Sequence, residues 1–245
     1  MEVFLGTHAP QELGPGNVWV TLTFAQSQDG KIAGANKRPL RLSGEKSMNM
    51  THHLRAMHDA ILVGIGTVLA DDPRLNVRLD NYSGLSPRPV ILDCHLQMPC
   101  ECRLLQRVPR ADPLVLCAEP ADQNARKAWE TRRQALEQAG AHIRTVETFK
   151  NPQGKLHLAW PSIFHVLAHE QLHSVMVEGG AAVIDSILAS HHLLHKVIVT
   201  VSPVRVGEDG VGYTATPLQH APYLQHIDTL ELPPDTVFAW DVVPC

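Results

Sequence analysis

An apolar run that stops at an acid and two glycines has the residue types of an anion-binding turn. The run covers residues 175–177, the acid is Glu178, and the glycines are Gly179 and Gly180, with small residues from Ala181 onward. Glycines let the backbone approach a ligand closely, and the free N–H groups of a new helix point at an anion. The same glycines could serve helix packing alone. The pattern therefore gives two readings, a phosphate cradle and a simple packing turn.

A second glycine turn follows an earlier apolar segment. Residues 60–63 are predicted to be a short buried strand, and 64–66 contribute two glycines before a helical turn over 67–70. Ligands of open α/β sheets bind beyond the carboxyl ends of the strands. Two such turns could form one site for a long, doubly anionic ligand, which suits a dinucleotide. The glycine fingerprint of an ordinary Rossmann domain is not found near the N-terminus.

These turns need a sheet to hold them, and strands alternate with helices for most of the chain. We expect a single α/β domain over residues 1–245, with a mostly parallel sheet and helices on both faces. Residues 1–16 contain several Gly and Pro and are expected to be a loose lead-in. The predicted strands are 18–24, 60–63, 89–93, 113–117, 143–146, 174–177, 196–201 and 237–243, and the predicted helices are 44–58, 122–139, 161–172 and 181–190.

Composition limits the classes of function. The 245 residues are 44% hydrophobic and carry a formal net charge of −4, so the chain can bury a core and charge does not indicate a nucleic-acid partner. Five cysteines form no C-x-x-C pair, which argues against a disulfide scaffold and indicates a reducing compartment. There is no signal-peptide pattern and no long apolar run, so we expect a cytoplasmic protein without a membrane partner.

Three blocks of sequence, in order, resemble the riboflavin-pathway reductases. They are residues 21–33, residues 54–73 with the run G-I-G-T-V-L-A-D-D-P, and residues 177–181 followed by 199–203. The chain is similar to 2,5-diamino-6-ribosylamino-4(3H)-pyrimidinone 5′-phosphate reductase of the stand-alone fungal and archaeal type. The resemblance implies a dihydrofolate-reductase-like fold and a homodimer. It also implies an NADPH-dependent oxidoreductase that converts the ribosyl group of this small-molecule phosphate to the ribityl form, early in riboflavin biosynthesis.

The resemblance also implies site residues, and no metal site. The expected cofactor-binding residues are Ala25, Gln26, Thr67, Asp71, Glu178, Gly179, Gly180, Ala181 and Ala182, and the expected substrate-binding residues are Arg55, Leu75 and Arg78. Arginine suits phosphate because its planar guanidinium presents several donors. Without the motif, a surface ion pair would be the default reading of either arginine. A basic partner for the 2′-phosphate of NADPH is not evident, and Arg126 and Lys127 are the available candidates.

Glu178 is the candidate catalytic residue. We expect it to hydrogen-bond the substrate or to help a proton move during reduction, and the alternative is that it caps the following helix. We also predict a cis peptide bond between Gly179 and Gly180, as this fold permits. Apart from Glu178, we expect the cofactor to supply the chemistry of the reduction and the protein to position the cofactor against the substrate.

The chain departs from the family at two places. Thr23 stands in the first strand where bacterial bifunctional relatives tend to have lysine, which favours the stand-alone type and argues against a lysine-based proton role. Residues 194–196 lack the aspartate that family members often carry before the late strand, so we expect dimer or loop contacts there to differ.

Other readings compete with the reductase. Residues 169–173 match the zinc-peptidase pattern H-E-x-x-H, although a buried strand begins directly afterwards. The fused bacterial deaminase activity is excluded, because residues 99–102 have the wrong cysteine spacing and no H-x-E precedes them. A dihydrofolate-reductase-type enzyme and a non-enzymatic NADPH-binding module remain as alternatives.

Overall fold

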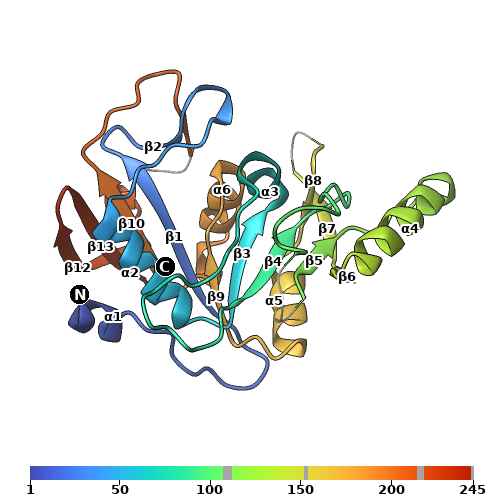
Figure 1. Ribbon diagram of the computed structural model, residues 1–245, viewed down its shortest axis with the longest axis horizontal. Helices are drawn as coiled ribbons and strands as arrows, with labels where there is room; N and C mark the ends of the chain where they lie inside the picture. Colours follow the sequence, from blue (N-terminus) through green and yellow to red (C-terminus); the bar gives the residue numbers. More distant parts are fainter. Residues whose placement is uncertain (107–111, 152–153, 214–217, 244–245) are drawn as a thin grey trace.

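One nine-stranded sheet organises the protein, whose computed structural model describes residues 1–106, 112–151, 154–213 and 218–243. The strand order is β12-β13-β10-β1-β9-β3-β4-β5-β6. All neighbours from β10 to β6 are parallel, and β13 and β12 are antiparallel at one edge (Figure 1). The prediction of a mostly parallel sheet is confirmed. The strands are β1 (Trp19–Ser27), β3 (Ala60–Gly64), β4 (Arg88–Leu92), β5 (Leu114–Cys117), β6 (His142–Thr145), β9 (Ser174–Val177), β10 (Lys196–Ser202), β12 (Leu224–Leu232) and β13 (Asp235–Val242).

The central strands are apolar on both faces because helices cover both faces. All four residues of β9 are buried, and its side chains alternate between two cores. Val175 and Val177 join one hydrophobic cluster, whereas Met176 joins another on the opposite face. This period of two assigns each residue of the strand to one face of the sheet.

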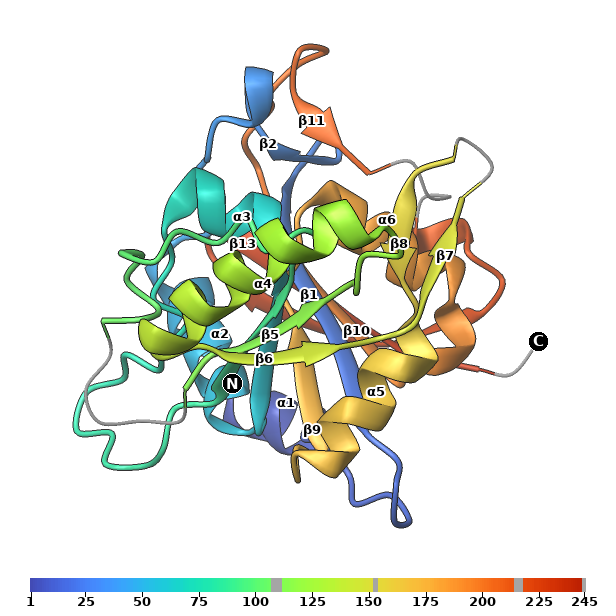
Figure 2. The same cartoon turned by 90° about the vertical axis from the view of Figure 1, so that its right-hand side faces the viewer.

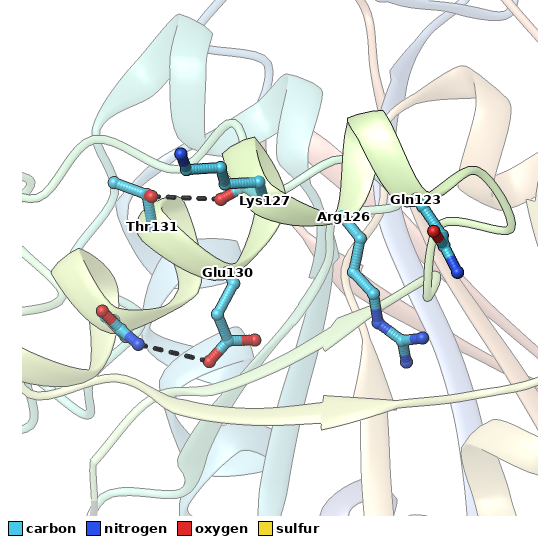
Figure 3. Close-up of a pocket in the computed structure, with 6 residues that line it drawn as sticks. Gln123, Arg126, Lys127, Glu130 and Thr131 are labelled. Atoms are coloured by element: carbon cyan, nitrogen blue, oxygen red, sulfur yellow. Dashed lines mark hydrogen bonds between the residues drawn. The ribbon is translucent and has the colours of Figure 1, made fainter.

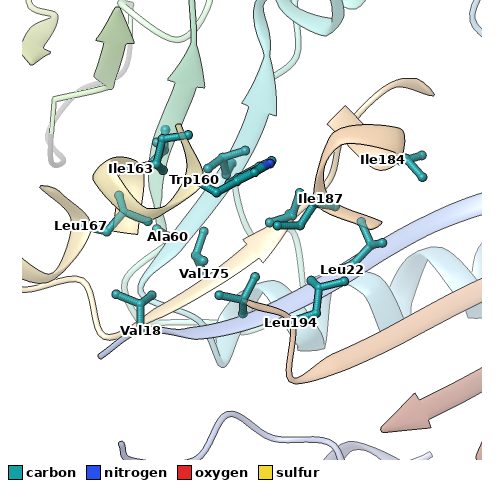
Figure 4. Packing of buried hydrophobic residues seen from close by; sticks show 14 of the residues in the cluster. Val18, Leu22, Ala60, Trp160, Ile163, Leu167, Val175, Ile184, Ile187 and Leu194 are labelled. Carbon is teal, nitrogen blue, oxygen red and sulfur yellow. The ribbon is translucent and has the colours of Figure 1, made fainter. Parts of the chain in front are cut away.

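Helices α5 (Trp160–His169) and α6 (Ala181–Ala189) cover the first face. The core there joins Trp160 and Ile163 of α5 and Ile187 of α6 to Leu22 and Val175 of the sheet (Figure 4). Burial of each such side chain stabilises the fold by roughly 1.5–3 kcal/mol. Helix α6 is therefore fixed against this face of the sheet.

The second face carries α1 (Glu2–Thr7), α2 (Glu45–Ala56), α3 (Ile65–Asp71) and α4 (Gln123–Gln138). The core contributions are Phe4, Met50 and Leu54 from α1 and α2, and Val68 and Leu136 from α3 and α4. Figure 2 looks onto the β6 edge, with α4 and α5 on opposite sides of the sheet. Within the described residues, no helix is long and apolar enough to span a membrane.

Some elements differ from the sequence-based predictions. The expected loose lead-in contains α1, whose Phe4 and Leu5 are buried, and the edge strand β12 has no predicted counterpart. Two short antiparallel strand pairs were also missed. The four cysteines that the structure describes are free thiols, and Cys245 lies outside the described residues. The two pairs are β2 (Lys31–Ala33) with β11 (Val211–Gly212), which are distant in the chain, and β7 (Thr148–Lys150) with β8 (Leu156–Leu158), which form a hairpin.

The H-E-x-x-H segment does not form a zinc site. Helix α5 ends at His169, and Gln171 has a left-handed φ of 58°, so His169 and His173 do not share one helical face. No cluster of three metal-ligating side chains occurs in the described part of the chain. The zinc-peptidase reading is therefore wrong.

Glu170 instead ties α5 to the amino ends of two strands. Its carboxylate accepts hydrogen bonds from Arg88 of β4 (2.8 Å) and Arg144 of β6 (3.0 Å). His142 accepts from Arg88 through Nδ1 (2.8 Å), and burial lowers the His142 pKa, so its imidazole is neutral. Burial raises the pKa of Glu170. The hydrogen bond from Arg88 and the charges of Arg88 and Arg144 together lower it by more, so the pKa of Glu170 is below its usual value.

We predict that Glu170→Gln lowers the free energy of unfolding by about 2–3 kcal/mol, because two guanidinium groups lose their carboxylate. Urea denaturation at neutral pH measures the change. The matched control Glu137→Gln removes only an exposed i,i+4 pair with Arg133 and should cost less than about 0.5 kcal/mol.

The ion pairs of Glu170 with Arg88 and Arg144 also predict that the free energy of unfolding depends on pH. A carboxylate whose pKa is depressed by folding stabilises the protein above its unfolded pKa, near 4.3 for glutamate, and loses this effect as pH falls through the folded pKa. The difference between wild type and Glu170→Gln should therefore shrink in acid. A difference that is constant between pH 7 and pH 3 would contradict the assignment.

Candidate active site

The two glycine turns meet at one edge of the sheet. Strands β3 and β9 are parallel neighbours, and the Glu178 N–H donates to the carbonyl of Leu62 (2.9 Å). Thr67 Oγ1 lies 3.6 Å from the position that a β-carbon on Gly180 would take. The first turn of α3 therefore faces the first turn of α6, as the sequence predicted for two segments of one site.

The side chain of Val183 explains why positions 64 and 179 are glycine. A β-carbon on Gly179 would stand 2.5 Å from Val183 Cγ1, and one on Gly64 would stand 2.9 Å from Val183 Cγ2. Neither position has room for a side chain, because α6 packs directly onto both turns. Gly180 differs, since its β-carbon would make only an ordinary contact.

The predicted cis peptide at Gly179–Gly180 is wrong. Among the described residues, the one cis bond is Pro233–Pro234. The Gly179–Gly180 bond is trans, and Gly180 precedes α6 in an extended conformation with φ −75° and ψ 177°.

Arg55 and Glu178 form a two-pronged ion pair beside these turns. Arg55 Nε donates to Glu178 Oε1 (2.7 Å) and Nη2 donates to Oε2 (2.6 Å). Both side chains are largely buried, and Arg55 Nη1 also donates to the carbonyl of Asn76 (3.2 Å). Burial lowers the pKa of Arg55, but the adjacent carboxylate raises it above its usual value, so the guanidinium stays charged. The pair joins the last turn of α2 to the turn between β9 and α6.

The segment after α3 brings the other substrate candidates next to Arg55. Arg78 is exposed, and its Nη1 donates to Asn76 Oδ1 (3.1 Å), so Asn76 contacts both arginines. Leu75 is 4% exposed and packs in the core with a left-handed φ of 44°. Burial, and then Arg55 and Arg78, lower the pKa of His52 to about 4, so its neutral Nδ1 accepts the Arg78 N–H (3.3 Å).

The remaining cofactor candidates lie along the same sheet edge. Ala25 and Gln26 end β1, and Asp71 is exposed on α3 four residues after Thr67, which places both on one helical face. Burial of part of the Asp71 side chain raises its pKa. Ala181 and Ala182 form the first turn of α6. Ala25, Gln26, Thr67 and residues 178–182 thus follow or end the neighbouring strands β1, β3 and β9.

Two residues that contact the predicted site residues, Tyr213 and Asn76, were not predicted from the sequence. Tyr213 donates its hydroxyl to Gln26 Oε1 (2.9 Å), and burial raises the Tyr213 pKa to about 12, which keeps that proton in place. The Gln26 amide is left with its NH₂ group for a ligand. Asn76 was also missed, because an asparagine between two predicted site residues carries no distinguishing pattern. The contacts of Asn76 with Arg55 and of Tyr213 with Gln26 join residues far apart in the sequence, so they are visible only in three dimensions.

Asp29 and Lys31 belong to a turn near the site. Asp29 accepts from Ser27 Oγ (2.6 Å) and from the N–H groups of Val206 (3.1 Å) and Gly207 (2.8 Å). The Ser27 hydroxyl, followed by the backbone donors, holds the Asp29 pKa well below its usual range. The carboxylate therefore fastens the turn after β1 to the loop after β10.

Arg126 and Lys127, the candidates for the 2′-phosphate, lie away from these turns. They line an open hollow of about 520 Å³ whose lining comes entirely from α4 (Figure 3). Arg126 is paired with Glu119. Because no residue of either glycine turn borders this hollow, the structure gives no support for the assignment.

Comparison with known proteins places the fold and the site blocks in one family. A sequence model of the RibD C-terminal domain matches residues 18–238. The 2,5-diamino-6-ribosylamino-4(3H)-pyrimidinone 5′-phosphate reductase of Debaryomyces hansenii is 35% identical over 209 residues, covering 83% of this chain and 81% of the relative. The reductase of the same name from Archaeoglobus fulgidus is 31% identical, covering 77% and 82%.

Solved structures of riboflavin-pathway proteins share the fold of this chain. The Saccharomyces cerevisiae riboflavin biosynthesis reductase Rib7 superposes with a TM-score of 0.72 at 26% identity, over 98% of both chains. Acinetobacter baumannii RibD gives a TM-score of 0.74 at 23% identity, covering 94% of this chain and 59% of that one, and supports the fold alone. The predicted dihydrofolate-reductase-like architecture is confirmed.

We predict that Gly179→Ala lowers the free energy of unfolding by about 1–3 kcal/mol, because the new methyl overlaps Val183. Thermal and urea unfolding measure it. Gly66→Ala is the matched control, since nothing lies within 4 Å of its β-carbon and alanine favours the helix. Equal losses of stability in the two variants would show that Val183 does not set the requirement for Gly179.

Proposed function

The chain belongs to the RibD C-terminal domain family, and on this premise we propose that it uses NADPH to reduce 2,5-diamino-6-ribosylamino-4(3H)-pyrimidinone 5′-phosphate. It is an oxidoreductase of riboflavin biosynthesis, as its relatives are. The observation that carries the finer proposal is the meeting of Thr67 with Gly180 beside the Arg55–Glu178 pair. A cofactor site and a charged substrate site thereby share one sheet edge.

The donor set suits a nicotinamide dinucleotide. The N–H groups of Gly180, Ala181 and Ala182 have no backbone acceptor in the described ranges, and Thr67 adds a hydroxyl beside them. Unsatisfied N–H groups at a helix start bind phosphate oxygens, and Gly180 leaves room for close approach. The Gln26 NH₂ group, oriented by Tyr213, provides a donor at the end of β1. When bound, NADPH supplies the hydride for reduction.

On the substrate side, charge and burial support a separate role for each residue. Arg78 presents an exposed guanidinium for the sugar phosphate, and Arg55 supports it through Asn76. Glu178 remains 17% exposed while it holds Arg55, so its carboxylate reaches the site without being free to rotate. Glu178 can accept a hydrogen bond from the substrate or relay a proton near the reacting carbon.

The deciding assay follows the loss of NADPH absorbance with purified protein. We expect oxidation that depends on the ribosylaminopyrimidine phosphate, with the ribityl compound as product. Dihydrofolate serves as the competing substrate for the dihydrofolate-reductase alternative. NADPH binding without oxidation of the cofactor by any of these substrates would favour the non-enzymatic module instead.

We predict that Glu178→Gln lowers kcat about 100-fold if the carboxylate relays a proton, the usual scale of acid-base catalysis. Glutamine also places an NH₂ against Arg55, so positioning must be separated from proton transfer. Arg55→Lys, which retains the charge but loses the fork geometry, should raise KM more than it lowers kcat. A Glu178→Gln enzyme with full turnover would exclude the proton role.

We also propose a homodimer in the cytoplasm. Strand β12 is the outer edge of the sheet, and most of its side chains are not buried, so its free backbone groups offer a pairing edge. The described cysteines remain unpaired, as in a reducing compartment. Light scattering should give twice the 27.0 kDa mass of the chain. A mass of one chain at micromolar concentration would exclude the dimer.

A further inference from the structure

The N-terminal helix α1 packs against α2 (Figure 1). Phe4 of α1 is buried in one hydrophobic cluster with Met50 and Leu54 of α2. Leu54 directly precedes Arg55 in the last turn of α2, so the docking of α1 supports the turn that bears the ion pair with the active-site carboxylate. Helix α1 precedes residues 18–238, so it lies outside the part of the chain that the family model matches.

His8 follows α1 directly, and its side chain is fully buried. Its Nε2 lies 3.3 Å from Asp228 Oδ2 of β12, and an ionised carboxylate only accepts, so Nε2 carries the proton of the neutral ring. The other ring nitrogen, Nδ1, is buried and has no hydrogen-bond partner among the described residues. A second proton would therefore enter the ring at an atom that faces no acceptor.

The charged groups around His8 come from three strands of the sheet. Asp228 of β12 and Asp241 of β13 favour a protonated ring, whereas Lys196 of β10 opposes it. Lys196 is itself buried, and its Nζ lies 2.5 Å from Asp241 Oδ1, so the lysine already neutralises that carboxylate. Helix α2 contributes apolar side chains to the contact with α1, and Glu2 of α1 is exposed. Burial, and then Lys196, lower the pKa of His8, so its ring is neutral at pH 7.

We propose that His8 is a pH-sensitive latch, which keeps α1 docked on α2 while its ring is neutral and releases α1 when the ring is protonated. Only the consequence for Arg55 rests on the proposed function. A folded-state pKa below the unfolded value of about 6.5 stabilises docking above that pH, and this stabilisation is lost as the pH falls. The docking equilibrium should weaken by up to about tenfold for each pH unit below about 6.5. Release uncovers Met50 and Leu54 and loosens the turn that holds Arg55.

Hydrogen–deuterium exchange of the peptide that covers residues 1–8 measures the docking of α1. The measured quantity is the protection factor, in which the intrinsic effect of pH on exchange is already corrected. In wild type we expect it to fall about fivefold between about pH 7 and about pH 5.5, because the released ring takes up a proton.

Two variants remove the titrating group in different ways. The neutral amide of His8→Gln can still donate to Asp228, and the ring of His8→Phe can still pack on Phe4. Both should keep the same protection factor across this pH range. The matched control is His226→Gln, which replaces an exposed histidine on the same strand as Asp228 and should retain the wild-type fall.

Two exchange results would overturn the latch. One is a wild-type protection factor that changes by less than about twofold over this range. The other is a fall of equal size in wild type and in the His8 variants, because a different group would then control α1. Either variant is sufficient for this comparison, so the decision does not depend on both of them folding.

The effect on Arg55 is tested by steady-state kinetics of wild type and His8→Gln at the same two pH values. Comparing the two proteins cancels the titration of the substrate phosphate and of the other groups. We expect KM for the proposed substrate to rise about threefold more in wild type, with KM for NADPH little changed. Equal changes in the two proteins contradict the link to Arg55. The exchange measurement needs no turnover, so it decides the latch even in a protein that does not reduce the proposed substrate.

Discussion

The ion pair between Arg55 and Glu178 connects parts of the chain that lie 123 residues apart. Arg55 closes the last turn of α2, and Asp235 holds the first turn by accepting from Gly44 N (2.7 Å) and Ser47 Oγ (2.5 Å). Helix α2 is thus fixed at both ends by carboxylates from other elements. Because a buried guanidinium without a partner is costly, the pair commits α2, the segment after α3 and the turn before α6 to one arrangement. The proposed substrate-binding residues depend on that arrangement for their direction.

The sheet supplies the rest of the positioning. Parallel strands with apolar residues on both faces place all their carboxyl ends along one edge, so that turns distant in sequence become neighbours. Val183 then sets the spacing, since it fills the volume that side chains at Gly64 and Gly179 would need. Glycine has two physical roles here. At those two positions it permits helix packing, whereas at Gly180 it leaves space beside Thr67, where we propose that the cofactor binds.

Sequence patterns predicted the elements whose signal is local. Buried strands such as β3 and β9 read as short apolar runs, and both glycine turns followed from their residue types. Strand β12 was missed because its polar, half-exposed residues pair only through β13, and α1 was missed because six residues bury just Phe4 and Leu5. The histidines of the H-E-x-x-H segment had metal-binding spacing, but the left-handed Gln171 separates them, and backbone conformation does not follow from spacing. Asn76 contacts Arg55, and Tyr213 contacts Gln26, so both act on residues distant in the sequence, which no local pattern encodes.

The central position of β1 has a consequence for how the protein is made. Strand β1, near the N-terminus, pairs on one side with β9 and on the other with β10. Trp19 therefore cannot pair until Ser174 has been synthesised, and Thr21 cannot pair with β10 until Lys196 has been synthesised. Contacts of such large sequence separation form slowly, since a long loop must close before they stabilise the chain. During synthesis, the first two thirds of the chain therefore emerge with an unpaired apolar strand. The proposed binding site can therefore form only after β9 and β10 have been synthesised. A fragment that ends before β9 contains most of the proposed site residues but cannot bring them together.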